Sequence, residues 1–424
     1  MKRLAIIAVF AVFLLGNVSC EKSSESYIDY EEILNAGDRR SKDDNPYKSL
    51  ELSTKSADFL KKGNAFTFEL IDRINKGSKE DFIISPLSVQ FLLGMVLDGA
   101  QGKTADEICN VLGYGSGEVD SVNEFCMSML KQLPTLDKQT TLSIANAIVV
   151  NQKYSLHDAY KTTVSKFYEA EVSNMDFTDR LGTADKINEW CSDQTNGLIP
   201  EIIAEVNPDM LVYLMNAVYF NGEWAKICKF QKENTSTEPF TLENGEKKNV
   251  QMMKNNIELY CLGNDVFTAV RIPYGNGAFN MMIILPDEGH TLQDVTESLK
   301  GQILKDFIIK KYKVDLWLPK FETKFSIRLN DMLSAMGMPS AFNEHTADFK
   351  SMTDTDIFLS YVKQDAFIKV DENGTEAAAV TSAGGLTTSL PAGPIVFHAD
   401  RPFLYLIVES NTGVVLFAGK YSGK

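Results

Sequence analysis

Helical signals dominate the first part of the chain that has a globular pattern. Apolar residues between 66 and 74 cluster at the spacing of an amphipathic helix. A second, largely buried helix is predicted to follow, with Ser85 as its N-cap and Pro86 at its first helical position. The run Thr104–Glu107 has the pattern of a capping box that opens a third helix, and Gly113 is placed to end that helix.

Strand signals dominate the second half. Apolar or β-branched runs bounded by turn residues predict strands there. These runs are 211–220, 279–285, 314–318, 366–370, 395–397, 404–408 and 414–417. No internal repeat and no second linker interrupts the chain from residue 56 to residue 424, which indicates one compact α+β domain.

One stretch near the C-terminus follows a stricter pattern. Every second residue from Thr375 to Gly385 is small and uncharged, and the only charge between Gly374 and Pro391, on Glu376, falls on the opposite face. A strand that joins the middle of a packed sheet must bring neither bulk nor unpaired charge to the buried face, because both are costly. We therefore interpret this stretch as a segment able to enter a sheet. The simpler alternative is an exposed loop rich in Ala, Gly, Ser and Thr.

Composition narrows the classes of partner. The chain has 424 residues, of which 44% are hydrophobic, and this is enough for a substantial core. Its net charge of −15 argues against nucleic acid and against polyanions such as heparin as the main partner, since both need a surface rich in Lys and Arg.

The N-terminus has the pattern of an export signal. A positive start and a short apolar run make residues 1–19 a predicted signal peptide, and Ser19 precedes Cys20 at the expected cleavage point. We expect Cys20 to carry a lipid and residues 20–55 to form an acidic tether. The protein would then be an outer-membrane, cell-surface or periplasmic lipoprotein of a Gram-negative bacterium. The alternative is an ordinary secretory signal with an incidental Cys20.

Enzymatic chemistry has no recognisable site in the sequence. The four histidines are in no catalytic context, and no phosphate-binding loop, metal-binding motif or prominent carboxylate pair is present, so neither a cofactor nor a metal is expected. The five cysteines beyond Cys20 show no metal-like spacing and are predicted to be buried free thiols. They are Cys109, Cys126, Cys191, Cys228 and Cys261.

Several separated motifs, in matching order, resemble those of the serpins, a family of serine protease inhibitors. The runs Glu372–Ala379 and Phe397–Leu404 resemble the family's hinge and C-terminal signature. Further motifs precede them: Phe82–Ser88, Gly99–Thr104, Met215–Trp224, Ile272–Tyr274, Leu285–Pro286 and Leu318–Phe321. The resemblance covers the chain from about residue 58 to residue 424. It implies three β-sheets, about nine helices and an exposed reactive loop at about 372–396.

The resemblance also gives roles to single residues. Four residues match the polar shutter beneath the central sheet, whose hydrogen bonds re-form when the strands part: Ser85, Ser88, Asn216 and Gln364. Gln364 takes the place of the usual histidine, so a pH response at that position is not expected. Three residues match the breach, where loop insertion starts, with an ion pair expected between the last two: Trp224, Lys320 and Glu372. The hinge comprises Glu372, Gly374, Thr375, Glu376, Ala377, Ala378 and Ala379.

The spacing usual in the family, counted from Gly374, places the cleaved bond at Thr388–Ser389. The loop has no Lys or Arg between Glu372 and Asp400, so trypsin-like proteases are poor targets. Elastase-like and subtilisin-like serine proteases are expected to cut at Thr388, with chymotrypsin-like or papain-like enzymes cutting after Leu386 as a second choice. The paired glycines Gly384–Gly385 are expected to slow the last part of insertion.

The resemblance implies suicide inhibition by a monomer that is not an enzyme. The protease would form an acyl-enzyme at the cut bond, and the freed loop would insert into the sheet before hydrolysis. Two alternatives stay open. One is a non-inhibitory serpin that acts as a carrier or structural protein. The other is a surface lipoprotein enzyme or a glycan-binding module, for which the likeness would be misleading.

Overall fold

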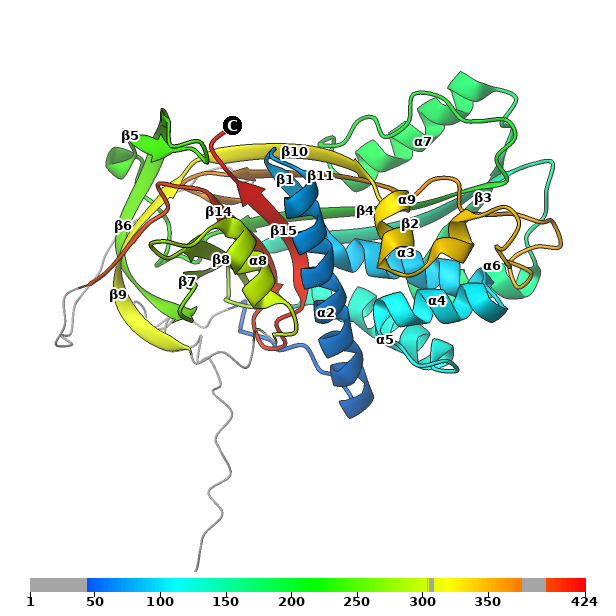
Figure 1. Ribbon diagram of the computed structural model, residues 1–424, viewed down its shortest axis with the longest axis horizontal. Helices are drawn as coiled ribbons and strands as arrows, with labels where there is room; N and C mark the ends of the chain where they lie inside the picture. Colours follow the sequence, from blue (N-terminus) through cyan, green and yellow to red (C-terminus); the bar gives the residue numbers. More distant parts are fainter. Residues whose placement is uncertain (1–43, 303, 305–308, 376–393) are drawn as a thin grey trace, which may run out of the picture.

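The computed structural model describes residues 44–302, 304, 309–375 and 394–424 (Figure 1). These residues form mostly helices in the first half of the chain and mostly strands in the second, as an α+β fold does. The α-helices are α2 (Thr54–Gly77), α3 (Pro86–Gly99), α4 (Gly102–Leu112), α5 (Val119–Gln132), α6 (Asp158–Tyr168), α7 (Arg180–Gln194), α8 (Leu292–Leu299) and α9 (Asn330–Met336). Within this part of the chain, no helix is both long enough and apolar enough to cross a membrane.

Six strands form the sheet that carries the candidate site. Their order across the sheet is β10 (Phe321–Arg328), β11 (Lys363–Val370), β12 (Gly374–Thr375), β4 (Val212–Glu223), β2 (Thr140–Asn151) and β3 (Glu171–Met175). Only β2 and β3 run parallel. In Figure 1 this sheet runs across the upper part of the molecule, with α7 over one side of it.

The other strands form a nine-stranded sheet. Its order is β1 (Phe82–Ile84), β15 (Val415–Tyr421), β14 (Phe403–Glu409), β8 (Phe279–Pro286), β7 (Phe267–Pro273), β6 (Lys247–Gly263), β9 (Lys310–Pro319) and β13 (Ile395–His398), with β5 (Ser236–Thr241) paired to β6 off this path. The 17-residue strand β6 pairs with β5, β7 and β9. Two of the three expected sheets are thus continuous through β6, and counted by hydrogen bonding the described residues form two sheets.

Helix α3 is the core helix between the two sheets. It packs on β4 of one sheet and on β15 of the other. Nearly every side chain of α3 is buried, because apolar residues surround the helix on all sides. Its N-terminus is built as predicted: Pro86 is in the first turn, and the Ser85 hydroxyl accepts a hydrogen bond from the Ser88 backbone N–H. This places two serines directly beneath the six-stranded sheet.

The predicted capping box at Thr104 is wrong. Helix α4 begins two residues earlier, at Gly102, and no side chain caps it, although Gly113 ends it in a left-handed conformation as predicted. Thr104 is fully buried, and its hydroxyl donates to the Thr346 carbonyl oxygen and accepts from the Asp348 backbone N–H. The Thr104 hydroxyl, which the local sequence pattern predicted to cap the helix, is thus used in tertiary contacts instead.

The end of the predicted tether lies on the domain. Leu50 is buried, and the Asn45 side chain donates to Asp137 at 2.6 Å and accepts from the Lys138 backbone N–H at 2.9 Å. The compact part of the structure therefore starts no later than residue 45, eleven residues before the start at residue 56 that composition predicts. Scattered apolar residues in a polar stretch gave too weak a signal to show this.

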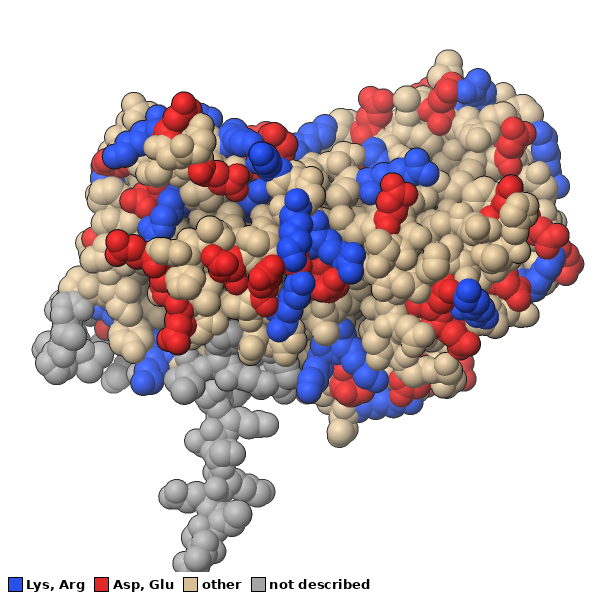
Figure 2. Space-filling model, in the orientation of Figure 1, with Lys and Arg blue, Asp and Glu red and all other residues tan. Residues whose placement is uncertain are grey.

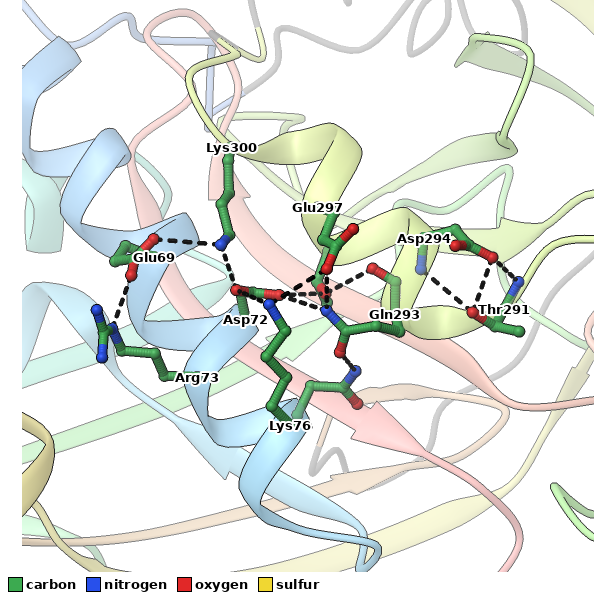
Figure 3. Close-up of polar contacts among 11 residues, drawn as sticks. Glu69, Asp72, Arg73, Lys76, Thr291, Gln293, Asp294, Glu297 and Lys300 are labelled. Atoms are coloured by element: carbon green, nitrogen blue, oxygen red, sulfur yellow. Dashed lines mark hydrogen bonds and ion pairs between the residues drawn. The ribbon is translucent and has the colours of Figure 1, made fainter.

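A cluster of charges joins α2 to α8 (Figure 3). Asp72 of α2 is buried, and it accepts from Thr296 and Gln293 of α8 and forms ion pairs with Lys76 and Lys300. Burial opposes the charge, but the hydrogen bonds from Lys300 and Lys76 outweigh it and hold the pKa of Asp72 at about 2.

On the face of the molecule shown in Figure 2, basic and acidic side chains are interspersed, so no broad basic surface forms there.

Candidate functional site

The site begins where the hinge enters the six-stranded sheet. Strand β12 consists of only two residues, Gly374 and Thr375, and it lies between two longer strands. Thr375 pairs with Val370 of β11 on one side and with Gly222 of β4 on the other. The first two residues of the predicted insertion segment are therefore already part of the sheet.

Gly374 is required by the close approach of β4. Its φ is +154°, and a Cβ atom placed on it would lie 2.1 Å from the Gly222 carbonyl oxygen and 2.8 Å from the Glu223 Cα. Both contacts are with backbone, which cannot move aside without opening the strand pair. Any larger residue at this position would push the hinge out of the sheet.

A layer of aromatic rings supports the hinge from below. The ring of Trp224 stacks on Tyr274 at a centroid distance of 4.6 Å and an angle of 11°. The Tyr274 hydroxyl forms a 2.6 Å hydrogen bond with the Thr375 hydroxyl, and both residues are buried. Trp224 also holds the preceding turn, since its indole N–H donates to the Asp371 carbonyl oxygen at 2.9 Å and its backbone N–H donates to the Asn373 carbonyl oxygen at 2.8 Å.

The ion pair expected at the breach is present. Lys320 Nζ lies 2.8 Å from Glu372 Oε2, and the Thr235 hydroxyl donates to Glu372 Oε1 at 2.9 Å. The Glu372 side chain is 5% exposed and that of Lys320 is 38% exposed, so the carboxylate is more dependent on the contact than the ammonium. Burial alone would raise the pKa of Glu372, but the hydrogen bonds from Lys320 and Thr235 outweigh it and lower that pKa.

Below the hinge, the two strands that flank β12 are not paired. The described residues contain no ladder between β4 and β11 beyond the bridge that β12 makes. A cavity of about 60 Å³ lies there instead, lined by Tyr213 and Met215 of β4, by Lys363 and Asp365 of β11, and by Ile187 of α7. Among the described residues, the edges of β4 and β11 that face each other below β12 therefore have no strand hydrogen-bonded to them.

The predicted shutter residues meet at the start of α3. The Gln364 side chain of β11 accepts from the Ser85 backbone N–H at 3.1 Å and donates to the Ser85 carbonyl oxygen at 2.8 Å. On the other strand, Asn216 of β4 accepts from the Ser88 hydroxyl. No hydrogen bond joins Gln364 to Asn216 among the described contacts, so the N-terminus of α3 connects two strands that do not connect to each other.

The structure extends this network to residues that sequence reasoning missed. Asn216 donates from Nδ2 to Asn146 Oδ1 of β2 at 2.7 Å, and Asn146 donates in turn to the Tyr168 carbonyl oxygen at 2.7 Å. Asn146 is 2% exposed. One signal was available: a lone Asn in the otherwise apolar run of residues 144–150 needs a buried partner.

Some of the expected site residues fall outside the described part of the chain. They are Glu376, Ala377, Ala378 and Ala379 of the hinge, Thr388 and Ser389 of the cleaved bond, and Cys20 of the lipid site. The other cysteines are buried free thiols as predicted. His398 ends β13, where its ring stacks on Trp317 at 4.0 Å and its Nε2 lies 3.0 Å from Asp315 Oδ2.

The described residues contain no group of His, Cys, Asp and Glu side chains arranged to hold a metal ion. What they do contain is a sheet with a half-entered strand, a polar network under the opening and an ion pair at its top. Such an arrangement supports a change of strand pairing.

Comparison with known proteins places the chain in a family. Residues 61–423 match the family model described as Serpin (serine protease inhibitor). The chain is 33% identical to leukocyte elastase inhibitor of Xenopus laevis over 375 residues, covering 84% of this chain and 97% of that protein. The native state of tengpin, a thermophilic serpin, matches with a TM-score of 0.78 and 28% identity over 90% of this chain and 97% of the other. Thyroxine-binding globulin in complex with thyroxine matches with a TM-score of 0.77 and 26% identity over 86% and 99% of the two chains. The chain therefore belongs to the serpin family.

Proposed function

We propose that this serpin is a suicide inhibitor of serine proteases. One observation carries the proposal: Gly374 and Thr375 lie between β4 and β11, whose remaining edges have no described partner. A loop that continues from Thr375 meets two rows of backbone donors and acceptors at the spacing of a sheet. The small residues at alternate positions from Thr375 to Gly385 suit the buried face of that strand.

The free energy that loop insertion can release is of the same order as the free energy needed to distort a bound protease. About a dozen new ladder hydrogen bonds at a net ~0.5–1.5 kcal/mol each give on the order of 10 kcal/mol. A typical protease is stable by only ~5–15 kcal/mol, so a tethered protease can be distorted. Loss of the oxyanion hole alone slows deacylation by ~10²–10³-fold. Inhibition is then a race between insertion of the loop and hydrolysis of the acyl-enzyme.

The target class follows from the loop sequence. We propose cleavage at Thr388–Ser389 by an elastase-like or subtilisin-like enzyme, because Leu386–Thr388 offers small and apolar side chains and the loop has no cation. The match to a leukocyte elastase inhibitor agrees with this choice, although that name describes the relative only. Cleavage after Leu386 by a chymotrypsin-like or papain-like enzyme is the second choice.

The test mixes the protein with an elastase-like serine protease and resolves the products on a denaturing gel. A covalent band that survives denaturation, together with a released fragment that begins at Ser389, is the expected result. The matched control is Thr375→Arg, which places charge and bulk at a position that is 2% exposed between two strands. This variant should be cut at the same bond without forming the covalent band.

Complete cleavage of the unaltered protein with the protease still active would contradict inhibition of that enzyme. Melting of the cleaved product then separates two cases. A large rise in thermal stability would mean that insertion works and that the target protease is a different one. No rise would favour a carrier or structural role, as the likeness to thyroxine-binding globulin allows.

A further inference from the structure

Asp98 is a partly buried residue whose carboxylate the proposed insertion step does not use. It is the second-last residue of α3, and its Oδ1 accepts from Asn123 Nδ2 of α5 at 2.7 Å. Its Oδ2 is closed off from solvent and has no hydrogen-bond partner. No described Lys, Arg or His forms an ion pair with it, and the negative end of the α3 dipole lies beside it. The unpartnered Oδ2, the absence of a described counter-charge and the helix dipole all disfavour the charged form, and only the hydrogen bond from Asn123 favours it.

The groups that face Asp98 offer no compensating charge. On α5 these are Asp120 and Cys126, and on α6 they are Tyr160 and Tyr168. Desolvation of the carboxyl and, to a smaller extent, the negative charge of Asp120 raise the pKa of Asp98 to about 7, while the hydrogen bond from Asn123 only partly offsets them. Asp98 therefore changes its charge near neutral pH.

A chain of hydrogen bonds connects Asp98 to the shutter. Asn123 accepts from the Tyr168 hydroxyl at 2.7 Å through its Oδ1, while its Nδ2 holds Asp98. The backbone carbonyl oxygen of Tyr168 accepts from Asn146, which in turn accepts from Asn216, the partner of Ser88. The chain starts at the C-terminal end of α3 and returns to its N-terminal end, where β4 and β11 part.

We propose that protonation of Asp98 controls how readily the six-stranded sheet opens. The neutral carboxyl keeps α3, α5 and α6 packed, so Tyr168 holds Asn146 and Asn216 in place. The ionised carboxylate has no counter-charge, so the three helices loosen around it and the bonds at Ser88 break more easily. Gln364, which contacts the N-terminal end of α3, cannot take up a proton in this range. The pH response would come instead from Asp98, at the C-terminal end of α3. The inference rests on the proposed function, because sheet opening is the step that admits the loop.

The direction of the pH effect follows from linkage. A carboxyl whose pKa is higher in the folded protein than in the unfolded chain holds its proton more tightly when folded. Stability therefore falls as the pH rises from about 4, the value for an unfolded Asp, toward about 7, and it levels off above that. The closed sheet should be most durable in mild acid.

The experiment measures the full chain between pH 5 and pH 8 in two ways: the urea midpoint of unfolding, and the rate of covalent complex formation with the elastase-like protease. For the unaltered protein we expect the midpoint to fall toward pH 7 and the rate to rise at least about fivefold, since one pKa unit corresponds to a tenfold change in an equilibrium constant. Asp98→Asn keeps the acceptor for Asn123 and should flatten both curves. Asp120→Asn removes the neighbouring charge and should move both transitions to lower pH.

Tyr168→Phe tests the route to the shutter. It breaks the contact to Asn123 but leaves the backbone carbonyl oxygen that Asn146 uses, so the urea midpoint should still titrate while the rate of complex formation no longer follows pH. Equal pH dependence in the unaltered protein and Asp98→Asn would overturn the inference, and so would an unchanged transition in Asp120→Asn. Absence of any complex, with a midpoint that still titrates through Asp98, would instead count against the proposed inhibition.

Discussion

The Gln364 side chain makes two hydrogen bonds to the backbone of Ser85, 279 residues earlier in the sequence, at 3.1 Å and 2.8 Å. It is the only described contact of the shutter that reaches β11 from the start of α3. Gln364→Ala would leave the buried Ser85 N–H without an acceptor, which costs roughly 1–3 kcal/mol of the free energy of unfolding. Urea unfolding measures this loss. Gln139→Ala, at an exposed position, is the control and should change stability little; an equal loss in both variants would contradict the role of Gln364.

Gly374→Ala should abolish inhibition while leaving the protein folded. The new Cβ would meet the Gly222 carbonyl oxygen at 2.1 Å, so strand β12 has to leave the sheet, at a cost of about 1–3 kcal/mol. The expected product with an elastase-like protease is cleaved serpin without the covalent band. Gly77→Ala, where nothing lies within 4 Å of the added atom, should behave as the unaltered protein. Full inhibition by Gly374→Ala would mean that β12 is not needed to start insertion.

Lys320→Ala should weaken the top of the sheet. It leaves the nearly buried Glu372 carboxylate without its ammonium, and we expect a loss of roughly 1–2 kcal/mol, between the values typical of exposed and of buried pairs. Thermal unfolding at pH 7 gives the measurement. Lys324→Ala, on the strand β10 that follows Lys320, exposed and in no ion pair of the described structure, is the matched control. If both variants melted alike, the ion pair would contribute nothing.

The same ion pair predicts a response to acid. The pKa of Glu372 is lower in the folded protein than in the unfolded chain, so its contribution is complete above the unfolded value of about 4.3 and is lost as the pH falls through the folded value. Thermal unfolding between pH 7 and pH 3 should show this loss in the unaltered protein. Glu372→Gln, which has no charge to lose, should show a smaller fall over the same range. Curves of the same shape for the two proteins would contradict the assignment of this acid response to Glu372.

We propose that Cys20 anchors the protein to a membrane, and Cys20→Ala tests it. Acyl chains add about 0.8 kcal/mol of membrane affinity for each buried CH₂ group, so the lipidated protein should sediment with membranes and incorporate labelled palmitate. The variant should be exported but recovered in the soluble fraction without label. Identical fractionation of the two proteins would show that Cys20 is not the anchor. A protein that stays in the cytoplasm would contradict the predicted signal peptide.

The sequence predicted best where a local pattern and the tertiary environment agree. Ser85 and Pro86 begin α3 as expected, because both act on backbone groups within one turn. Thr104 shows the reverse case: its hydroxyl suits a helix cap, but Thr346 and Asp348 take it instead. The strands at 279–285 and 404–408 were clear because both of their faces are buried and apolar. The structure places a few residues before the expected domain start, such as Leu50, on the domain, and composition gave little sign of this because they lie in a polar stretch.

By itself, the sequence determined which residues could take part: a small-residue strand after Gly374, a polar set at Ser85, Ser88, Asn216 and Gln364, and the charges of Lys320 and Glu372. Only the tertiary structure decided how they meet. Strand order places β12 between β4 and β11 and leaves the edges below it without a described partner. It also connects Asp98, through Asn123, Tyr168 and Asn146, to the same opening. The physical reason is that these contacts join residues far apart in the chain, and no local periodicity encodes which strands and helices become neighbours.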